Sequence, residues 1–503
     1  MSRVREDSPA GLARADEATR GSAVKLAAEV LSRLLTVAST FVLVRGLGVE
    51  RLGSFSGLWV LAPILAELGE MGLQATATRA LVADTRSLAA FVKARLFLLG
   101  LLATLGVAAA AFAPSLVSLL PPWLRVEAPE VGVLVLLVFH FVLAGWAEFF
   151  GVALRCRGAR VAEAGVLLSL RGAVLAFVVL ALLLGAGLAG VGLALLLSSL
   201  PAILLGALLL RRHPAGPPAP DAPVARVLRE ALPLAVYGAL LLAGPRVEFL
   251  VVWALRGDRE TALFFSALAM LWPLALVPSA VAAGAMPALT REALLGGSVV
   301  RRRTAATVAL FAAPSAVGLV LVAPGLVPLV FGSDFARAAV WVRILALALV
   351  PMFLNGLVAW ALIAAGRSNQ PPRLVAARIA VSLALALVLV PRFGATGAAA
   401  SFVAAETVML ALGARACAAA GFRLPLAGPV AVALLASIPM ALAVRGVPHS
   451  PVGAVAVGVL TYAATLAVVW HLFPRLWAGV VSGASEGKAP LERATRREGA
   501  VRR

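Results

Sequence analysis

The stretch FVLVRGLGVERLGSFSGLWVLAP, Phe41–Pro63, decides the fold of this chain. It holds the end of one apolar run, a short connection that carries Arg45 and Arg51, and the start of the next run. The two runs, Ser22–Val44 and Ser54–Thr76, are each long enough to cross a hydrocarbon core about 30 Å thick as a helix. Backbone polar groups in lipid must be bonded within the protein, so this pattern predicts two membrane-spanning helices joined by a tight connection.

The same pattern continues along the rest of the chain. Of its 503 residues, 62% are apolar, and the mean hydropathy of +1.00 is too high for a soluble domain. Strands of a membrane barrel would show short alternating segments instead. The sequence therefore predicts an all-α integral membrane protein of about fourteen spans. The twelve further predicted spans are 88–111, 131–154, 162–184, 191–210, 230–253, 262–286, 304–322, 336–365, 374–391, 394–412, 425–444 and 452–472.

The basic residues between the spans predict the orientation. Every second connection is rich in arginine, as at Arg301, Arg302 and Arg303, and the connections between them carry few, as at Arg125. Positive loops stay on the cytoplasmic side. Both termini are therefore predicted to be cytoplasmic, in the inner membrane of a bacterium. The net charge of +20 follows from this topology, which argues against a nucleic-acid partner.

An internal repeat divides the chain. The segment FSGLWVLAP, Phe55–Pro63, aligns with FSALAMLWP, Phe265–Pro273, with five identities in nine at an offset of 210 residues. Six spans per repeat place both halves in the same orientation, and repeat-built transporters hold their substrate between the repeats. The pairs that follow at similar offsets are Leu154 with Leu362, Gly158 with Gly366, Gly187 with Gly394, and Gly190 with Gly397.

The predicted fold is therefore two parallel six-helix lobes plus two C-terminal helices. The predicted segments are a cytoplasmic tail at 1–21, an N-terminal lobe at 22–210, a Pro-rich cytoplasmic linker at 211–229, a C-terminal lobe at 230–412, two additional helices at 425–474 and a basic tail at 475–503.

Charged residues within the spans are the candidate binding residues, because a charge at the centre of a span costs about 2.5 to 3.5 kcal/mol. Lys25, Glu29 and Arg33 are spaced four residues apart and share one helix face. Arg246 lies near the repeat equivalent of Arg33. The full set of candidates for a substrate-binding cavity is Lys25, Glu29, Arg33, Glu67, Glu70, Glu148, Arg171 and Arg246.

Two alternatives remain for some of these residues. Instead of binding a substrate, Lys25 could extend its side chain to the lipid headgroups. Glu67 or Glu70 could form an ion pair between two helices. Prolines within spans remove a backbone hydrogen bond and kink the helix, which predicts either hinges or static kinks. The hinge candidates are Pro63, Pro233, Pro245, Pro273 and Pro278.

Motifs of enzymes and of metal or cofactor sites are missing from the sequence. SEGKA, Ser485–Ala489, lacks the spacing of a phosphate-binding loop. Cys156 and Cys417 lack the spacing of metal ligands, and His140 has no companion ligand, so it is expected to be a packed or hydrogen-bonded histidine. The loops expected outside are too short to hold catalytic groups. The chain is predicted to be no enzyme and to need no cofactor or metal.

Several motifs resemble those of the polysaccharide exporters, the lipid-linked oligosaccharide flippases of the multidrug/oligosaccharidyl-lipid/polysaccharide (MOP) superfamily. The resemblance covers about Ala23 to Leu412. It rests on the order and spacing of motifs. In the first half these are Arg45, Leu47-Gly48, Gly53, Phe55-Ser56, Gly72 and Thr78-Arg79, and in the second half the segments 245–292, LVFGSDFARAA, GLVAWALIAAGRSNQ and FGATGAAAS.

This resemblance implies two lobes around a central cavity that opens alternately to each side of the membrane. The implied substrate is a polyprenyl-pyrophosphate-linked glycan, such as a precursor of O-antigen, exopolysaccharide or peptidoglycan. The implied partners are the bilayer, this glycan lipid and, as further candidates, other proteins of polysaccharide assembly. Cationic residues of the first helix face the cavity in lipid II flippases, and Lys25 and Arg33 occupy comparable places. Two alternatives remain, namely a cation-coupled multidrug exporter and a membrane glycan ligase or assembly subunit.

Overall fold

The computed structural model describes residues 9–83, 87–119, 127–214, 220–274, 281, 285–286, 288–293, 297–424, 426–447 and 450–472. These residues form helices and turns, with no strand among them. The predicted all-α membrane fold is therefore confirmed. Pro278 lies outside the described residues.

Two compact units make up the chain, Met1–Phe265 (unit 1) and Ser266–Arg503 (unit 2). The helices that begin in unit 1 are α1 (Pro9–Glu70), α2 (Leu73–Val82), α3 (Leu88–Ala111), α4 (Ala113–Leu119), α5 (Ala128–Cys156), α6 (Arg160–Leu183), α7 (Leu188–Ser198), α8 (Leu200–Arg212), α9 (Val224–Ala243), η1 (Gly244–Arg246), α10 (Val247–Arg256) and α11 (Asp258–Leu271). The predicted lobe boundaries at 210 and 230 stay a prediction.

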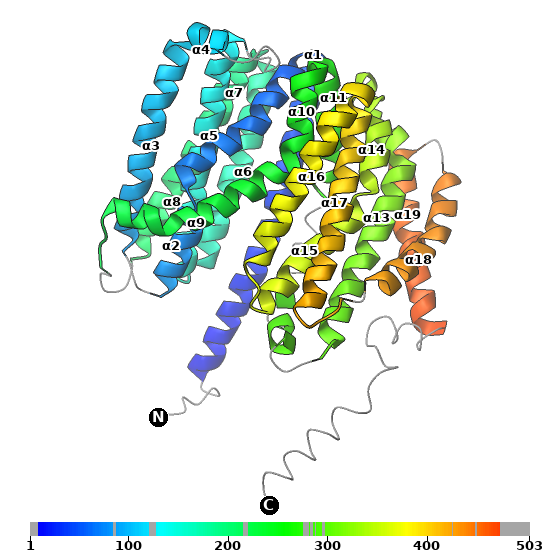
Figure 1. Ribbon diagram of the computed structural model, residues 1–503. Coiled ribbons are helices and arrows are strands. Elements are labelled where there is room, and N and C mark those ends of the chain that lie inside the picture. The colour runs from blue at the N-terminus through cyan, green and yellow to red at the C-terminus, as the bar shows by residue number, and fades with distance from the viewer. Residues whose placement is uncertain are drawn as a thin grey trace, which may run out of the picture. The chain divides into compact units, whose positions relative to one another are not determined.

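The described part of unit 2 also consists of helices. Its helices are α13 (Val299–Phe331), η2 (Ser333–Phe335), α14 (Ala338–Ala346), α15 (Leu349–Ala364), α16 (Gln370–Phe393), α17 (Ala395–Ala419), α18 (Ala427–Arg445) and α19 (Pro451–Leu472). Figure 1 shows α16 and α17 running side by side, and α13 packs against α14, α15, α18 and α19. In unit 1, α5 and α6 pack against each other and against α1, α7 and α8.

Within the described residues, 11 helices are long and apolar enough to cross a membrane, or 12 if the bent pair α14 and α15 counts as one span. One of them, Ala27–Glu70, covers most of the first and of the second predicted span. The eighth predicted span, Ala262–Met286, lies partly outside the described residues. The structure therefore accounts for about fourteen predicted spans.

Four predicted spans are less regular than the sequence suggested, and the seventh, 230–253, is divided into α9 and α10 by the 3₁₀ turn η1. The second, Ser54–Thr76, breaks between α1 and α2, where Met71 has a φ of 40° and Gly72 a φ of 67°. The sixth is two helices that meet at Ser199. The tenth, α14 with α15, bends by 44°. Apolar periodicity does not register such breaks, because both parts of a broken helix remain apolar.

Small side chains hold the helices together. The buried face of α13 includes a series of alanines: Ala305, Ala306, Ala309, Ala312, Ala313 and Ala316. Large leucines point outward instead, as at Leu183 and Leu460, which are 79% and 69% exposed. Lipid tails are as apolar as leucine, so helices in a membrane associate through close packing of small residues. This distribution is the one expected for a protein whose outer surface faces lipid.

One pair of aligned glycines, Gly158 and Gly366, has the same local conformation in both halves, whereas Gly187 (φ −68°) and Gly394 (φ 59°) differ. Gly158 and Gly366 end α5 and α15 with φ values of 77° and 74°. Beyond each glycine the next amide returns to a leucine carbonyl five residues back, at 3.0 Å for Leu154 and 2.8 Å for Leu362. This is the Schellman arrangement, which favours glycine because the φ is positive. This pair fits the predicted repeat, and the repeat itself stays a prediction.

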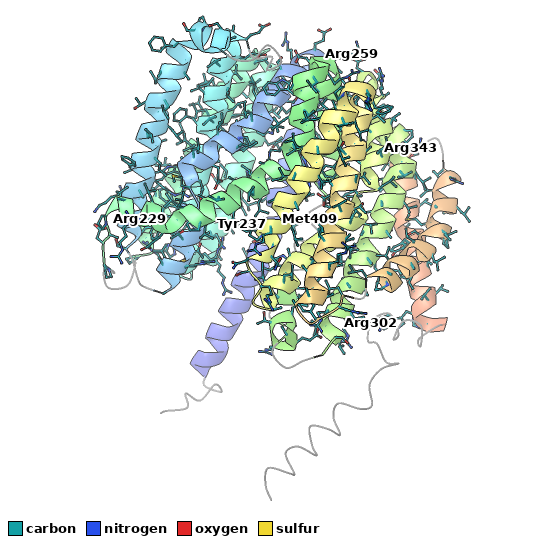
Figure 2. All side chains as sticks on the ribbon, viewed as in Figure 1. Arg229, Tyr237, Arg259, Arg302, Arg343 and Met409 are labelled. Carbon is teal, nitrogen blue, oxygen red and sulfur yellow. The ribbon has the colours of Figure 1, made fainter. Side chains whose placement is uncertain are left out.

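Arginines lie at opposite ends of each unit. Figure 2 shows Arg229 at the start of α9 far from Arg259 of α11 in unit 1, and Arg302 at the start of α13 far from Arg343 of α14 in unit 2. Arg229, Arg259 and Arg302 lie in connections between predicted spans. The positions of these three residues agree with the predicted alternation of connections between the two sides of the membrane. The cytoplasmic side itself stays a prediction.

Candidate functional site

A cavity of about 370 Å³ opens within unit 1, between α1, α2, α5 and α6. Helix α1 provides Glu29, Ser32, Arg33 and Thr36 to its wall. These four positions follow the spacing that places residues on one face of a helix. The predicted charged face of the first span therefore borders a cavity. Lys25 lies in α1 as well, but its side chain is outside what the structure describes.

The opposite wall of the cavity carries two ion pairs between α5 and α6. Arg171 donates to Glu148 over 2.7 Å, and both side chains are about one-third exposed, at 30% and 36%. Arg155 and Glu163 form the second pair, at 2.6 Å, with Glu163 buried. The structure thus brings together four of the predicted candidates, Glu29, Arg33, Glu148 and Arg171.

Arg33 differs from the other two arginines of the cavity. Its side chain is exposed, and among the described residues no hydrogen bond or ion pair is formed by its guanidinium. The wall carries three glutamates and three arginines, so its formal charges balance. With Arg155 and Arg171 paired, Arg33 is the arginine of this wall that stays available to an anion. Guanidinium groups bind phosphates with charge-assisted, often bidentate hydrogen bonds.

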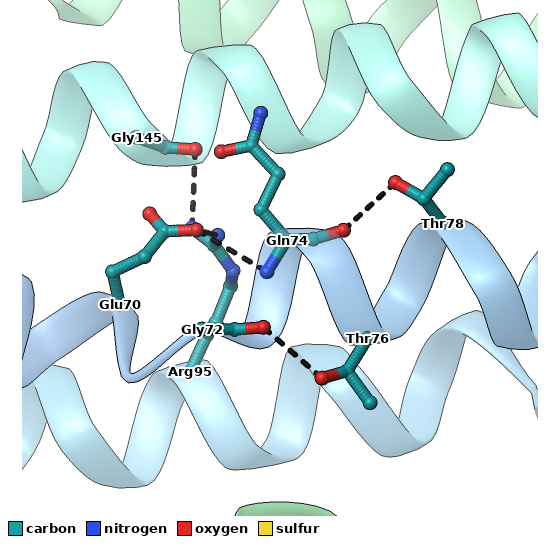
Figure 3. Close-up of polar contacts among 7 residues, drawn as sticks. All are labelled: Glu70, Gly72, Gln74, Thr76, Thr78, Arg95 and Gly145. Carbon is teal, nitrogen blue, oxygen red and sulfur yellow. Dashed lines mark hydrogen bonds and ion pairs between the residues drawn. The ribbon is translucent and has the colours of Figure 1, made fainter. Parts of the chain in front are cut away.

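Glu70 lies outside the cavity wall, in a buried ion pair. Its carboxylate accepts from Nη2 of Arg95 in α3 over 2.7 Å, as Figure 3 shows. Arg95 is 2% exposed and also donates to the carbonyl of Gly145 in α5 over 3.1 Å. Its guanidinium lies 4.5 Å from the ring centre of Phe149. The prediction of an ion pair between helices is therefore confirmed for Glu70.

Glu67 and Arg246 do not line the cavity either. The carboxylate of Glu67 reaches helix α9, where a β-carbon on Gly238 would lie 2.8 Å from its Oε1. Arg246 belongs to η1, the short 3₁₀ turn between α9 and α10, and its Nη1 donates to the carbonyl of Leu242. A substrate-binding role for these two residues stays a prediction.

The candidate hinge prolines occupy different settings. Pro63 lies inside α1, whose non-helical dihedral angles are at Gly48 and not at the proline. Pro233 lies inside α9, and Pro245 forms part of the η1 break. Pro273 follows the end of α11 in a turn. The structure thus places a break in the helix at Pro245, while movement at any of these prolines stays a prediction.

His140 is a packed, hydrogen-bonded histidine, as predicted. Its ring lies 3.2 Å from the hydroxyl of Ser199 and stacks on Trp59 at 6.1 Å between ring centres. No group of three or more potential metal ligands occurs among the described residues.

Unit 2 contains a second buried ion pair. Arg378 of α16 donates to Glu406 of α17 over 2.9 Å, and both side chains are under one-tenth exposed. Asn355 of α15 donates to the same carboxylate over 2.8 Å. The three side chains join three helices in the interior of the unit.

Sequence reasoning missed several of these residues. Arg155 falls just beyond the predicted span 131–154, although it lies in the last turn of α5. Gln74 lines the cavity from α2 but is uncharged, so a search for intramembrane charges passes over it. One signal was available for Glu163, because it lies eight residues before Arg171 and so shares its helix face.

No protein-family model and no curated protein sequence matches the chain. Solved structures do share its fold. The lipid II flippase MurJ in an inward closed conformation has a TM-score of 0.70 at 13% identity, over 89% of this chain and 98% of that one. An inward-facing MATE-family multidrug resistance transporter of the MOP superfamily has a TM-score of 0.58 at 18% identity, over 78% of this chain and 96% of that one.

A third similar structure is a MOP-superfamily transporter from Pyrococcus furiosus, described as having a binding pocket of reversed polarity that suggests a different function. Its TM-score is 0.54 at 17% identity, over 79% of this chain and 94% of that one. The chain is therefore a multi-pass membrane protein with the fold of MOP-superfamily transporters. The resemblance seen in the sequence is confirmed at the level of the fold.

Proposed function

We propose that this protein is a flippase that moves a polyprenyl-pyrophosphate-linked saccharide across the bacterial cytoplasmic membrane by alternating access. The single observation that carries the proposal is Arg33, a cavity arginine without a partner among the described residues. A pyrophosphate is the group in such a substrate that a free guanidinium binds best. The fold shared with the lipid II flippase MurJ supports the same proposal.

In this proposal the pyrophosphate and its sugar enter the cavity, and the polyprenyl tail stays in the bilayer. The predicted lobes at 22–210 and 230–412 would move against each other, with both termini cytoplasmic. The substrate shifts the balance between inward- and outward-facing states only by its difference in affinity for them. An ion gradient or the membrane potential would therefore supply direction.

Native mass spectrometry of the gently extracted protein tests this proposal. We expect the wild type to carry a polyprenyl-pyrophosphate saccharide and Arg33→Ala to lose it. Arg343→Ala is the matched control, because Arg343 is an exposed arginine of α14 that lies outside the cavity. Loss of the lipid from both variants, or its retention in Arg33→Ala, would contradict the proposed role of Arg33. Arg246→Ala in the same assay tests the second predicted cationic residue.

The second candidate function is a cation-coupled multidrug exporter. The observation that favours it is the set of three glutamates in the cavity wall, Glu29, Glu148 and Glu163, together with the fold shared with MATE transporters. Carboxylates attract cationic drugs and coupling ions. Uptake of a cationic dye into inverted vesicles separates the two functions. Transport of the dye that Glu148→Gln abolishes and Arg33→Ala leaves unchanged would favour the exporter.

A further inference from the structure

Gln74 is the uncharged cavity residue with the greatest capacity for hydrogen bonding. Its side chain lines the cavity from the first turn of α2, and within the described residues its amide group has no hydrogen-bond partner. Figure 3 shows this amide extending away from the Glu70–Arg95 pair. A glutamine amide offers two N–H donors and an oxygen that accepts two hydrogen bonds. This combination suits the hydroxyl and acetamido groups of a sugar.

The position of Gln74 depends on the break between α1 and α2. Met71 and Gly72 both have positive φ, at 40° and 67°, which turns the chain before α2 begins. A side chain at residue 72 would collide with helix α9, because its β-carbon would lie 2.6 Å from the backbone nitrogen of Ala235. The break therefore requires glycine at position 72, both for its φ and for its contact with α9.

Glu70 fixes the first turn of α2 after this break. Its Oε1 accepts the backbone N–H of Gln74 over 3.2 Å and Nη2 of Arg95 over 2.7 Å. Arg95 is anchored in turn by the carbonyl of Gly145. The backbone of Gln74 is thus bonded to a buried ion pair, while its amide group faces the cavity.

We propose that Gln74 binds the saccharide next to the pyrophosphate and so determines which glycan is accepted, and that Glu70 and Arg95 position it. This inference rests on the proposed function, in which Arg33 binds the pyrophosphate. The two tasks are divided between two helices, with the cation on α1 and the amide on α2. Glu70 and Arg95 act through Gln74 and contact no substrate.

Two lipid probes test the division of tasks. The first is undecaprenyl pyrophosphate, and the second is the same lipid with one N-acetylglucosamine attached. Affinity of each purified variant is measured for both probes in detergent micelles, and the ratio of the two affinities is the readout. We expect the wild type to bind the sugar-bearing lipid more tightly. In Gln74→Ala this preference should fall about tenfold, which is the amount that one or two hydrogen bonds contribute. The affinity of Gln74→Ala for the bare lipid should stay unchanged.

Further variants separate positioning from general stability. Arg95→Ala should reduce the ratio as Gln74→Ala does, and Arg95→Lys should restore part of it, since lysine retains the charge beside Glu70. Thr78→Val is the matched control on α2, because the Thr78 hydroxyl donates to the carbonyl of Gln74 over 2.8 Å but lies outside the cavity wall. It should leave the ratio unchanged. A merely structural effect would weaken both probes equally.

The outcomes distinguish this inference from the proposed function. Equal affinity of the wild type for both probes, or an unchanged ratio in Gln74→Ala, would overturn the role of Gln74 and leave the flippase proposal standing. Binding of neither probe by the wild type would overturn both. Loss of both probes in Arg33→Ala, with the ratio lowered in Gln74→Ala and Arg95→Ala and unchanged in Thr78→Val, would support both.

Discussion

Gly57 of α1 lies directly against the indole of Trp253 in α10. A β-carbon at residue 57 would be 2.2 Å from Cε2 of the ring and 2.4 Å from Nε1. One turn earlier, a β-carbon at Gly53 would be 2.5 Å from the carbonyl oxygen of Asp258. Two glycines four residues apart thus allow α1 to approach the α10–α11 junction closely. Small residues at this spacing are typical of close helix packing in membranes.

Gly57→Ala should therefore destabilise unit 1. Overpacking a tightly packed position costs about 1 to 3 kcal/mol, because Trp253 must move. The midpoint of thermal unfolding in detergent measures the effect. Gly100→Ala is the matched control, since no atom lies within 4 Å of the added carbon in α3. Combining Gly57→Ala with Trp253→Ala should cost less than the sum of the two changes. Additive losses would show that the two residues do not interact.

The buried pair of unit 2 should be sensitive to loss of one partner. Removing Glu406 leaves Arg378 buried without a carboxylate, which costs about 3 to 5 kcal/mol. Glu406→Leu should therefore unfold at a lower temperature than the double variant Glu406→Leu, Arg378→Met, in which neither charge remains. Thermal unfolding of the single and double variants measures this order. A double variant less stable than either single variant would mean that the pair itself is strongly stabilising.

Glu148→Gln should tighten the binding of undecaprenyl pyrophosphate. Glu148 competes for Arg171. Partly exposed ion pairs are worth about 0.2 to 1 kcal/mol, so freeing Arg171 should raise the affinity about 1.4- to fivefold. Titration with the lipid in micelles measures the change, with Glu50→Gln as an exposed control outside the cavity. Weaker binding in Glu148→Gln would show that Glu148 itself contacts the ligand.

The linker before α9 should be held by a pH-dependent contact. Lys93 of α3 donates to Asp221, and this hydrogen bond, with one from the Ala222 amide, lowers the pKa of Asp221 below its ordinary value of 3.8. A lowered carboxyl pKa contributes stability above the ordinary pKa, and that stability is lost as the pH falls through the lowered value. The amide of Ser87, which donates to Pro220 over 3.0 Å, reports on this contact.

Hydrogen exchange of the Ser87 amide, corrected for intrinsic rates, should show constant protection from neutral pH down to about pH 4 and a decrease below it. Asp221→Asn should be less protected at neutral pH and show no such decrease. Equal protection of wild type and Asp221→Asn at neutral pH would mean that Pro220, and not Asp221, holds the segment.

Much of the fold could be predicted from local patterns. Apolar runs of sufficient length predicted the helices, and the alignment of Gly158 with Gly366 predicted two positions with the same backbone conformation. Both features depend on residues that are close together in the sequence, so a sequence pattern can reveal them. The break at Gly72 was missed because α2 is as apolar as a continuing helix would be. At this break Gly72 lies against Ala235 of α9, a contact between residues far apart in the sequence.

The sequence alone determined that this chain is helical and spans a membrane, because burial of apolar length and bonding of the backbone within each helix are properties of each segment by itself. It also identified most of the charges that lie within the spans. Only the tertiary structure decided how those charges are used. It paired Arg171 with Glu148 and Arg95 with Glu70, and it placed Arg33 and Gln74 in the wall of one cavity. Such pairings depend on which helix faces meet, and packing between distant segments decides that.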